Sequence, residues 1–223
     1  MERHFERGLE ELKETLVRMG GMVDVQLALA CRALFDGDAG RAREVMAGDR
    51  EIDTLDSLID RKCMDIFALA QPVAVDLRLL MSALAINSQL ERIGDIAVNV
   101  AERVEPLVPY REFLLGTRLA EMADIARIMV RDSLDSFIRG DAELASRVLV
   151  SDDVVDKMDG ALFRSLVSSM KEQHELIEPA AHCLILARHI ERLADHATNI
   201  AEDVIFIVEA RQVKHNAGEE IRR

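Results

Sequence analysis

Aromatic residues, glycine and proline are scarce in this 223-residue chain. Tryptophan is absent, aromatic residues make up 4% of the sequence, and there are only 11 glycines and 4 prolines. Folds built from many short strands need frequent turn residues, so this scarcity argues against an all-β protein. Hydrophobic residues nevertheless make up 49% of the chain, mostly as Ala, Leu, Ile, Val and Met. We therefore expect a core of closely packed helices.

Positive charge is also in short supply. The chain has 28 Lys and Arg residues against 41 Asp and Glu residues, which gives a formal net charge of −13. Nucleic-acid binding depends on basic patches that neutralise phosphates, so we exclude DNA and RNA as partners. An acidic surface suits metal cations or the basic surface of a partner protein instead.

Cysteine and long hydrophobic runs are likewise limited. Three cysteines lie far apart in apolar, helix-like sequence and form no C-x-x-C pair, which is typical of reduced core thiols: Cys31, Cys63 and Cys183. The most apolar stretch, residues 66–86, is interrupted by Asp76 and Arg78 and does not resemble a membrane span. The charged N-terminal residues do not resemble a signal peptide, so we expect a cytoplasmic protein with no membrane insertion.

One phrase occurs twice, shifted by one hundred positions. The sequence ERIGDIAVNVAE at 91–102 returns as ERLADHATNIAE at 191–202, with both glutamates, the aspartate and the asparagine in register. An upstream aspartate pattern recurs at an offset of 103, because Asp49, Asp53 and Asp56 match Asp152, Asp156 and Asp159. The molecule is therefore built twice, and each half carries the same acids.

Helical periodicity runs through both halves. In the first half we predict three helices: one that ends near 36–37, one over about 39–70, and one that runs from the break at Pro72 to about 104. In the second half we predict helices over about 113–139, 141–173 and 179–213, with Asp38 and Asp141 as N-caps after glycine. Short connections favour antiparallel neighbours. We expect an all-α fold of six long helices in two tandem three-helix bundles, 1–108 and 109–214, followed by a polar tail, 215–223.

Each repeated phrase places acids and an amide on one face of a helix. At about 100° per residue, Glu91, Asp95, Asn99 and Glu102 fall within about 80°, as do Glu191, Asp195, Asn199 and Glu202. A solvated acidic face is one interpretation, although like charges at i,i+4 cost roughly 0.2–0.5 kcal/mol per pair. The other is a site for a hard or borderline cation such as Mg, Ca, Mn or Fe. Asp24 and Asp132 are candidate ligands from facing helices.

Catalytic motifs are missing from the sequence. There is no Glu-x-x-His pair of the ferritin-like di-iron type, no P-loop and no G-x-S-x-G nucleophile elbow. Three histidines recur at seven-residue spacing, and we interpret them as residues at the edge of the core: His182, His189 and His196. Of these, His196 lies beside Asp195 and is the best candidate for a metal ligand. We do not expect an enzyme.

The two phrases closely resemble those of the PhoU family of phosphate-transport accessory proteins. The resemblance extends to MGGMVD at 19–24, to PVA and DLR within 72–78, and to the basic ending Val213-Lys214-His215, so it covers nearly the whole chain. It implies a six-helix fold of two three-helix bundles, a homodimer, and no catalytic activity. It also implies a negative regulator of phosphate uptake and of the phosphate-starvation response. The implied partners are the ATPase subunit of the phosphate ABC transporter and a sensor histidine kinase.

The resemblance further implies surface metal clusters held by E/D-x-x-x-D motifs. Carried to this sequence, the ligands are Glu91 with Asp95 and Glu191 with Asp195, supported by Asn99 and Asn199. The ions would be divalent or trivalent, such as Fe, Mn, Mg or Zn. Ala194 and His196 in the second phrase replace Gly94 and Ile96 of the first, so we expect the two sites to differ. A carboxylate-bridged metalloenzyme and a metal or phosphate buffer protein are the competing functions.

Overall fold

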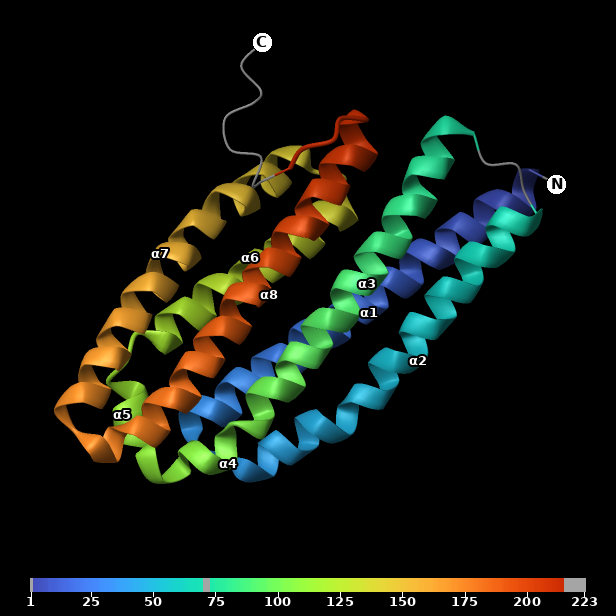
Figure 1. The fold of residues 1–223 in the computed structure, drawn as a ribbon. Coiled ribbons are helices and arrows are strands. Elements are labelled where there is room, and N and C mark those ends of the chain that lie inside the picture. Colours follow the sequence, from blue (N-terminus) through green and yellow to red (C-terminus); the bar gives the residue numbers. More distant parts are fainter. Residues whose placement is uncertain (1, 70–72, 215–223) are drawn as a thin grey trace, which may run out of the picture.

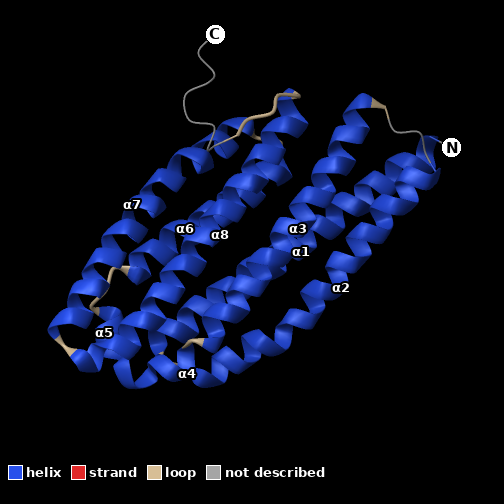
Figure 2. Cartoon of the chain, viewed as in Figure 1, coloured by secondary structure: helices blue, strands red, loops and turns tan. Residues whose placement is uncertain are grey.

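Six long helices build the protein (Figure 1). The computed structural model describes residues 2–69 and 73–214, and within this part of the chain no residue lies in a β-strand (Figure 2). The long helices are α1 (Glu2–Asp36), α2 (Ala39–Leu69), α3 (Ala74–Glu102), α6 (Leu119–Arg139), α7 (Ala142–Glu172) and α8 (Ile177–Glu209). Shorter elements join them, namely α4 (Val104–Leu107), α5 (Arg111–Leu115) and two 3₁₀ turns, η1 (Val108–Tyr110) and η2 (His174–Leu176).

The helices form two bundles that lie side by side. In the first half α1, α2 and α3 pack on one another, and in the second half α6, α7 and α8 do the same (Figure 1). The bundles are joined because α3 packs against α8 and α1 packs against α6. The all-α fold of six long helices with an internal repeat, predicted from the sequence, is confirmed.

Equivalent turns join the first two helices of each bundle. Gly37 and Gly140 both have positive φ, 72° and 62°, a conformation that glycine adopts without steric cost. The next residue caps the following helix, because Asp38 Oδ1 accepts from Arg41 N and Asp141 Oδ1 accepts from Leu144 N, each at 2.9 Å. Both predicted N-caps are confirmed.

Several predicted helix ends are wrong. The fourth long helix begins at Leu119 rather than near 113, because α5 ends at Leu115, Gly116 follows it as the C-cap, and the Thr117 hydroxyl accepts from Leu119 N at 3.3 Å. The last helix begins at Ile177, since Pro179 lies in its first turn, where no intrahelical N–H is needed. It ends at Glu209 rather than near 213, followed by Ala210 with φ 54°. Pro72, His215 and the predicted tail 215–223 lie outside the described residues.

The core is aliphatic, as the composition predicted. Leu, Ile, Val, Ala and Met side chains from all six long helices form one hydrophobic cluster. All three cysteines are free and buried, and burial raises the pKa of each thiol to about 11, so the thiols stay protonated and inert. The interpretation of the cysteines as core thiols is confirmed.

The contact between α3 and α8 includes polar side chains that recur every seven residues along each helix. Gln89 Oε1 accepts from Asn199 Nδ2 at 3.2 Å and lies 2.7 Å from His196 Nδ1, which therefore carries the proton. Seven residues before Gln89 and seven after His196, Ser82 lies beside Asp203. One heptad before His196 on α8, His189 lies near Glu102 and Arg103 at the end of α3. The three histidines are half-buried at the edge of the core, as predicted.

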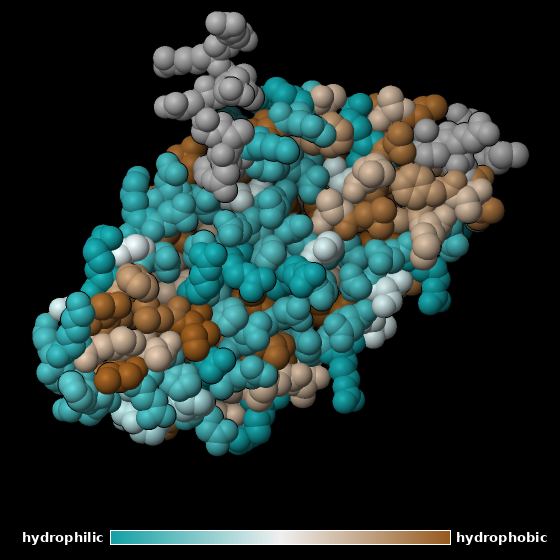
Figure 3. Space-filling view, viewed as in Figure 1, coloured by the Kyte–Doolittle hydropathy of each residue, from teal (hydrophilic) through white to brown (hydrophobic). Residues whose placement is uncertain are grey.

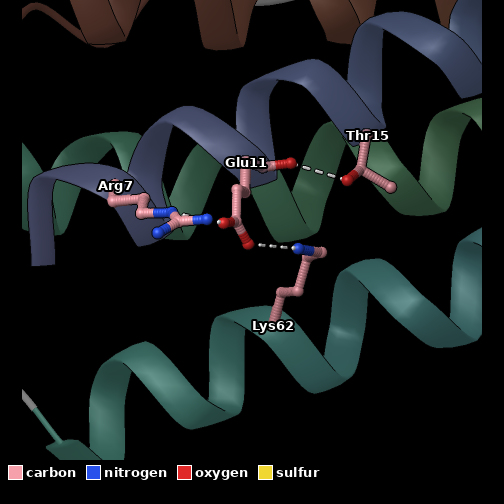
Figure 4. Close-up of polar contacts among 4 residues, drawn as sticks. All are labelled: Arg7, Glu11, Thr15 and Lys62. Atoms are coloured by element: carbon pink, nitrogen blue, oxygen red, sulfur yellow. Dashed lines mark hydrogen bonds and ion pairs between the residues drawn. The ribbon is translucent and has the colours of Figure 1, made fainter. Parts of the chain in front are cut away.

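The surface of the first bundle has an apolar region near the turn between α2 and α3 and a charged region where Glu11 joins α1 to α2. Hydrophobic side chains are exposed where α2 ends and α3 begins, and Figure 3 shows apolar surface in this region, next to the grey residues: Met64, Leu69, Val73, Val75, Leu77 and Met81. Further along, Glu11 joins α1 to α2 by accepting from Arg7 Nε at 3.1 Å and from Lys62 Nζ at 3.2 Å (Figure 4). These hydrogen bonds, that with Lys62 most of all, lower the pKa of the Glu11 carboxyl.

Candidate metal centres

Carboxylates of α2 and α3 meet in what we call the first cluster: Asp49, Asp53, Asp56, Glu91 and Asp95. Burial raises the pKa of Glu91, the negative charge of Asp95 adds to the shift, and Asp56 and Asp53 add further, against the opposing effect of Arg92. Charges on both helices therefore act on one carboxyl group. On each helix the acids are three or four residues apart, so they share one face. The two faces meet where α2 and α3 pack against each other.

Two α2 aspartates of the first cluster are also perturbed. Burial is the largest cause of the raised pKa of Asp49, with Asp53 and Asp95 adding to it. Burial is likewise the main cause of the raised pKa of Asp56, to which Asp60 and Asp53 contribute. Partly buried like charges without a counter-ion disfavour ionisation, and a bound cation would reverse that effect.

Two buried amides border the first cluster. Asn87, 1% exposed, donates from Nδ2 to Asp56 Oδ1 at 2.7 Å and to Asp60 Oδ1 at 3.2 Å, while its own Oδ1 is buried without a hydrogen-bond partner. Gln26 reaches from α1 and donates from Nε2 to Asp49 Oδ1 at 3.3 Å, and its Oε1 is also buried without a partner. Both amides therefore offer an oxygen that no protein group uses.

The second cluster, between α7 and α8, repeats the arrangement with Asp156, Asp159, Glu191 and Asp195, and the repeat adds Asp152 as the equivalent of Asp49. Burial raises the pKa of Glu191, followed by the charge of Asp195 and then those of Asp159 and Asp156, while Arg188 acts in the opposite direction. Arg188 Nη1 forms an ion pair with Glu191 Oε1, and Glu191 Oε2 is buried without a hydrogen-bond partner.

Glu91 and Asp95, and Glu191 and Asp195, lie in the clusters, but the amides named from the sequence are placed differently. Asn99 is half-buried one turn beyond Asp95, whereas Asn199 donates its Nδ2 to Gln89 at the contact between the bundles. His196 also contacts Gln89 rather than an acid, and burial lowers its pKa to about 4, with Arg192 and Arg92 adding to the effect.

Asp24 and Asp132 are not among the charged groups that shift the pKa of Glu91 or Glu191. A Cβ atom at Gly20 would come within 2.7 Å of Leu134, so this face of α1 packs on α6, and Asp24 follows one turn later on the same face. By the offset of the Gly37 and Gly140 turns, Asp132 corresponds to Leu29, which lines a groove of about 360 Å³ between α1 and α2. Besides Asp95 and Asp195 on the same helices, the charges that raise the pKa values of Glu91 and Glu191 come from α2 and α7.

The sequence analysis did not assign the aspartates of α2 and α7 to either site. Their repetition at an offset of 103 was the available signal, but it could not show which helix face they share with Glu91 and Glu191. Within the described residues, no group of three or more His, Cys, Asp or Glu side chains already converges on a point that could hold a metal ion. The donors are nevertheless carboxylate and amide oxygens, which suit Mg, Mn or Fe better than Zn, and unpaired buried oxygens remain in both clusters.

Comparison with known proteins explains the repeat. Residues 16–104 and 119–204 each match the PhoU domain. The chain belongs to the PhoU family. Each matched PhoU domain contains one acidic cluster, and the interval between the two domains holds most of α4, together with η1 and α5. The predicted boundary between 108 and 109 falls in this interval.

Similar proteins share both sequence and fold. A PhoU homolog of Pseudomonas putida, named a phosphate-specific transport system accessory protein, is 38% identical over 214 residues, 96% of this chain and 84% of that protein. A protein of the same name from Aquifex aeolicus is 41% identical, covering 93% and 94% of the two chains. The crystal structure of PhoU from Pseudomonas aeruginosa matches with a TM-score of 0.87 and 36% identity, over 93% of this chain and 100% of that one.

A more distant PhoU has the same architecture. The phosphate transport system regulatory protein PhoU from Streptococcus pneumoniae matches with a TM-score of 0.83 at 27% identity, over 94% of this chain and 99% of that one. In the part of this chain that the structure describes, none of the helices combines the length and apolar character needed to cross a bilayer.

Proposed function

We propose that this chain is a cytoplasmic regulator of phosphate homeostasis that acts by binding other proteins. Its relatives are named phosphate-specific transport system accessory proteins, and they match it over nearly its full length. The proposed partners are the ATPase subunit of the phosphate ABC transporter and a sensor histidine kinase, with this chain acting as a homodimer. Its output would be lower phosphate uptake and weaker phosphate-starvation signalling.

We further propose that the two acidic clusters bind metal ions. The observation that carries this proposal is the repeated meeting of partly buried carboxylates whose pKa values are raised by burial and by one another. Glu91 and Asp95 would bind in the first cluster together with the α2 aspartates, and Glu191 and Asp195 in the second together with those of α7. A bound cation would neutralise these charges and tie two helices of each bundle together.

Elemental analysis of protein purified without chelator or affinity tag tests the metal proposal. We expect a stoichiometric metal in the wild type and its loss from the Asp95→Ala, Asp195→Ala double variant, with helicity retained in circular dichroism. Replacing the exposed pair Asp124 and Asp135 on α6 by Ala removes the same charge and serves as the control. Equal metal content in the wild type and the double variant would contradict the proposal.

Phosphate uptake tests the regulatory proposal separately. Expressed in a bacterium that lacks its own PhoU, this chain should lower uptake of radiolabelled phosphate and repress alkaline phosphatase in phosphate-rich medium. Purified chain should also bind the purified ATPase subunit of the transporter. Unchanged uptake and phosphatase levels, despite normal expression, would count against a regulatory role even if metal is bound.

A further inference from the structure

The two clusters differ at the residue one turn before the repeated glutamate, Glu91 or Glu191. Position 88 in the first half is serine, and its equivalent, position 188, is arginine. Arg188 Nη1 is paired with Glu191 Oε1, and the Glu191 side chain is only 15% exposed. Glu91 is 32% exposed and has a weaker contact, 3.5 Å from Oε2 to Nε of Arg92, its neighbour in the chain. The second cluster therefore holds a positive charge against its one glutamate.

The far end of the clusters differs as well. In the first half Asn87 joins Asp56 to a sixth carboxylate, Asp60, through its Nδ2. The equivalents in the second half are Ala187 and Phe163, which provide neither an amide nor a carboxylate. Asn87 is almost fully buried, and its unpartnered Oδ1 is a neutral donor available to a cation. The first cluster thus has one more carboxylate and one more amide than the second at this end.

These differences act in the same direction on cation binding. A metal that binds Glu191 must displace or share the Arg188 guanidinium, because both are attracted to the same carboxylate oxygens. Opening the Arg188–Glu191 ion pair therefore offsets part of the metal's binding free energy, by an amount that solvent limits because the Arg188 side chain is 65% exposed. At Glu91 only the longer contact with Arg92, 3.5 Å, would have to open, since residue 88 is a serine.

We infer that the first cluster is the tighter metal site, and that Arg188 sets the difference by serving as a built-in counter-ion of the second cluster. This inference rests on the metal binding proposed above and adds an order of filling to it. The α2–α3 cluster fills first, and the α7–α8 cluster fills only at higher metal concentration, when Arg188 leaves Glu191. Exchanging the two residues, one in each direction, isolates the effect.

Mn²⁺ titration of the full chain, with free Mn²⁺ measured by electron paramagnetic resonance, tests the inference. In the wild type we expect a tight and a weak class of sites, assigned to the clusters by their loss in Asp95→Ala and Asp195→Ala. Arg188→Ser should tighten the weak class by roughly threefold or more, since solvent screens an ion pair whose arginine is largely exposed. Ser88→Arg should weaken the tight class and leave the weak class unchanged.

Two further variants separate the local effect from charge and folding. Arg147→Ser removes an exposed arginine that is paired with Glu143 on α7, and it should change neither class. Arg188→Gln removes the charge but keeps much of the side chain, and it should reproduce Arg188→Ser if that variant folds poorly. Sites that bind Mn²⁺ with equal affinity in the wild type would overturn this inference but leave the metal proposal standing. So would affinities that stay unchanged in both Arg188 variants. No Mn²⁺ binding by any variant would overturn the metal proposal with it.

Discussion

The two bundles present the same five acids on equivalent helices, but what surrounds those acids differs. Around the first cluster the neighbouring groups are amides and an additional carboxylate, whereas around the second an arginine is paired with the central glutamate. The repeat therefore keeps the spacing of the acids, while the residues around the acids differ in charge between the two halves. Two copies of one sequence motif in the same chain therefore need not form equivalent sites.

The cores offer the strongest test of how far the two bundles are equivalent. Leu90 and Ile190 occupy equivalent positions and are at most 2% exposed, so replacing either by Ala should destabilise the protein by about 2–5 kcal/mol. Urea denaturation followed by circular dichroism would measure both. We expect a single transition, because α3 packs on α8 and α1 on α6. Val150→Ala, at a 71% exposed position, should have little effect. Two transitions, each shifted by only one variant, would show independent bundles.

The polar contact between the bundles should respond less strongly. Gln89→Ala removes the acceptor of His196 Nδ1–H and leaves a buried donor unpaired, which we expect to cost about 1–3 kcal/mol in urea denaturation. Gln89→Leu combined with His196→Leu replaces both partners by apolar groups and should cost less than Gln89→Ala alone. A double variant that is less stable than the single one would show that the polar pair contributes to stability beyond its own hydrogen bond.

The stability of the protein should depend on pH through Asp203. The equivalent position in the first half, 103, is arginine and should add no such dependence. Burial raises the pKa of Asp203 from 3.8 to about 7, with Ser82 acting against the shift and Glu202 adding to it. The folded state therefore favours the protonated carboxyl, and its stabilising contribution is lost as the pH rises through 7.

Thermal unfolding between pH 5.5 and 8.5 measures the effect of Asp203. Relative to Asp203→Asn, the wild type should lose stability on the order of 1–2 kcal/mol across this range, since the carboxyl is only partly buried. Arg103→Gln, at the equivalent position directly after α3, should leave the pH dependence unchanged. Parallel pH profiles for the wild type and Asp203→Asn would contradict the prediction.

The smallest effect concerns an ion pair that only the first bundle has. Lys62 and Glu11 join α2 to α1, while their equivalents in the second bundle are Ser165 and Leu114. Both side chains are partly exposed, so Lys62→Met should shift the melting temperature by less than about 2 °C. The shift should shrink further in high salt, because ions screen the pair. A larger, salt-independent shift would indicate that packing of the lysine stem matters more than its charge.

Much of the fold could be predicted because its signals are local. The Gly37 and Gly140 turns, the aspartate caps that follow them and the apolar periodicity of the helices act within about four residues of the chain. The break before α6 was missed because no proline marks it, and a glycine and a threonine hydroxyl end one helix and begin the next. The start of α8 was misplaced because a proline in a first turn was read as the beginning of the helix.

The sequence by itself determined that the chain is duplicated, that it is helical, and that α3 and α8 each carry an acidic stripe, since all three follow from repetition and helical periodicity. Only the tertiary structure decided which helices face those stripes. Packing brings the aspartates of α2 to Glu91 and those of α7 to Glu191, turns Asn199 toward Gln89, and places Asp24 on the face of α1 that packs on α6. The physical reason is that ligand sets form between helices, and the pairing of helix faces depends on burying apolar surface across the whole molecule.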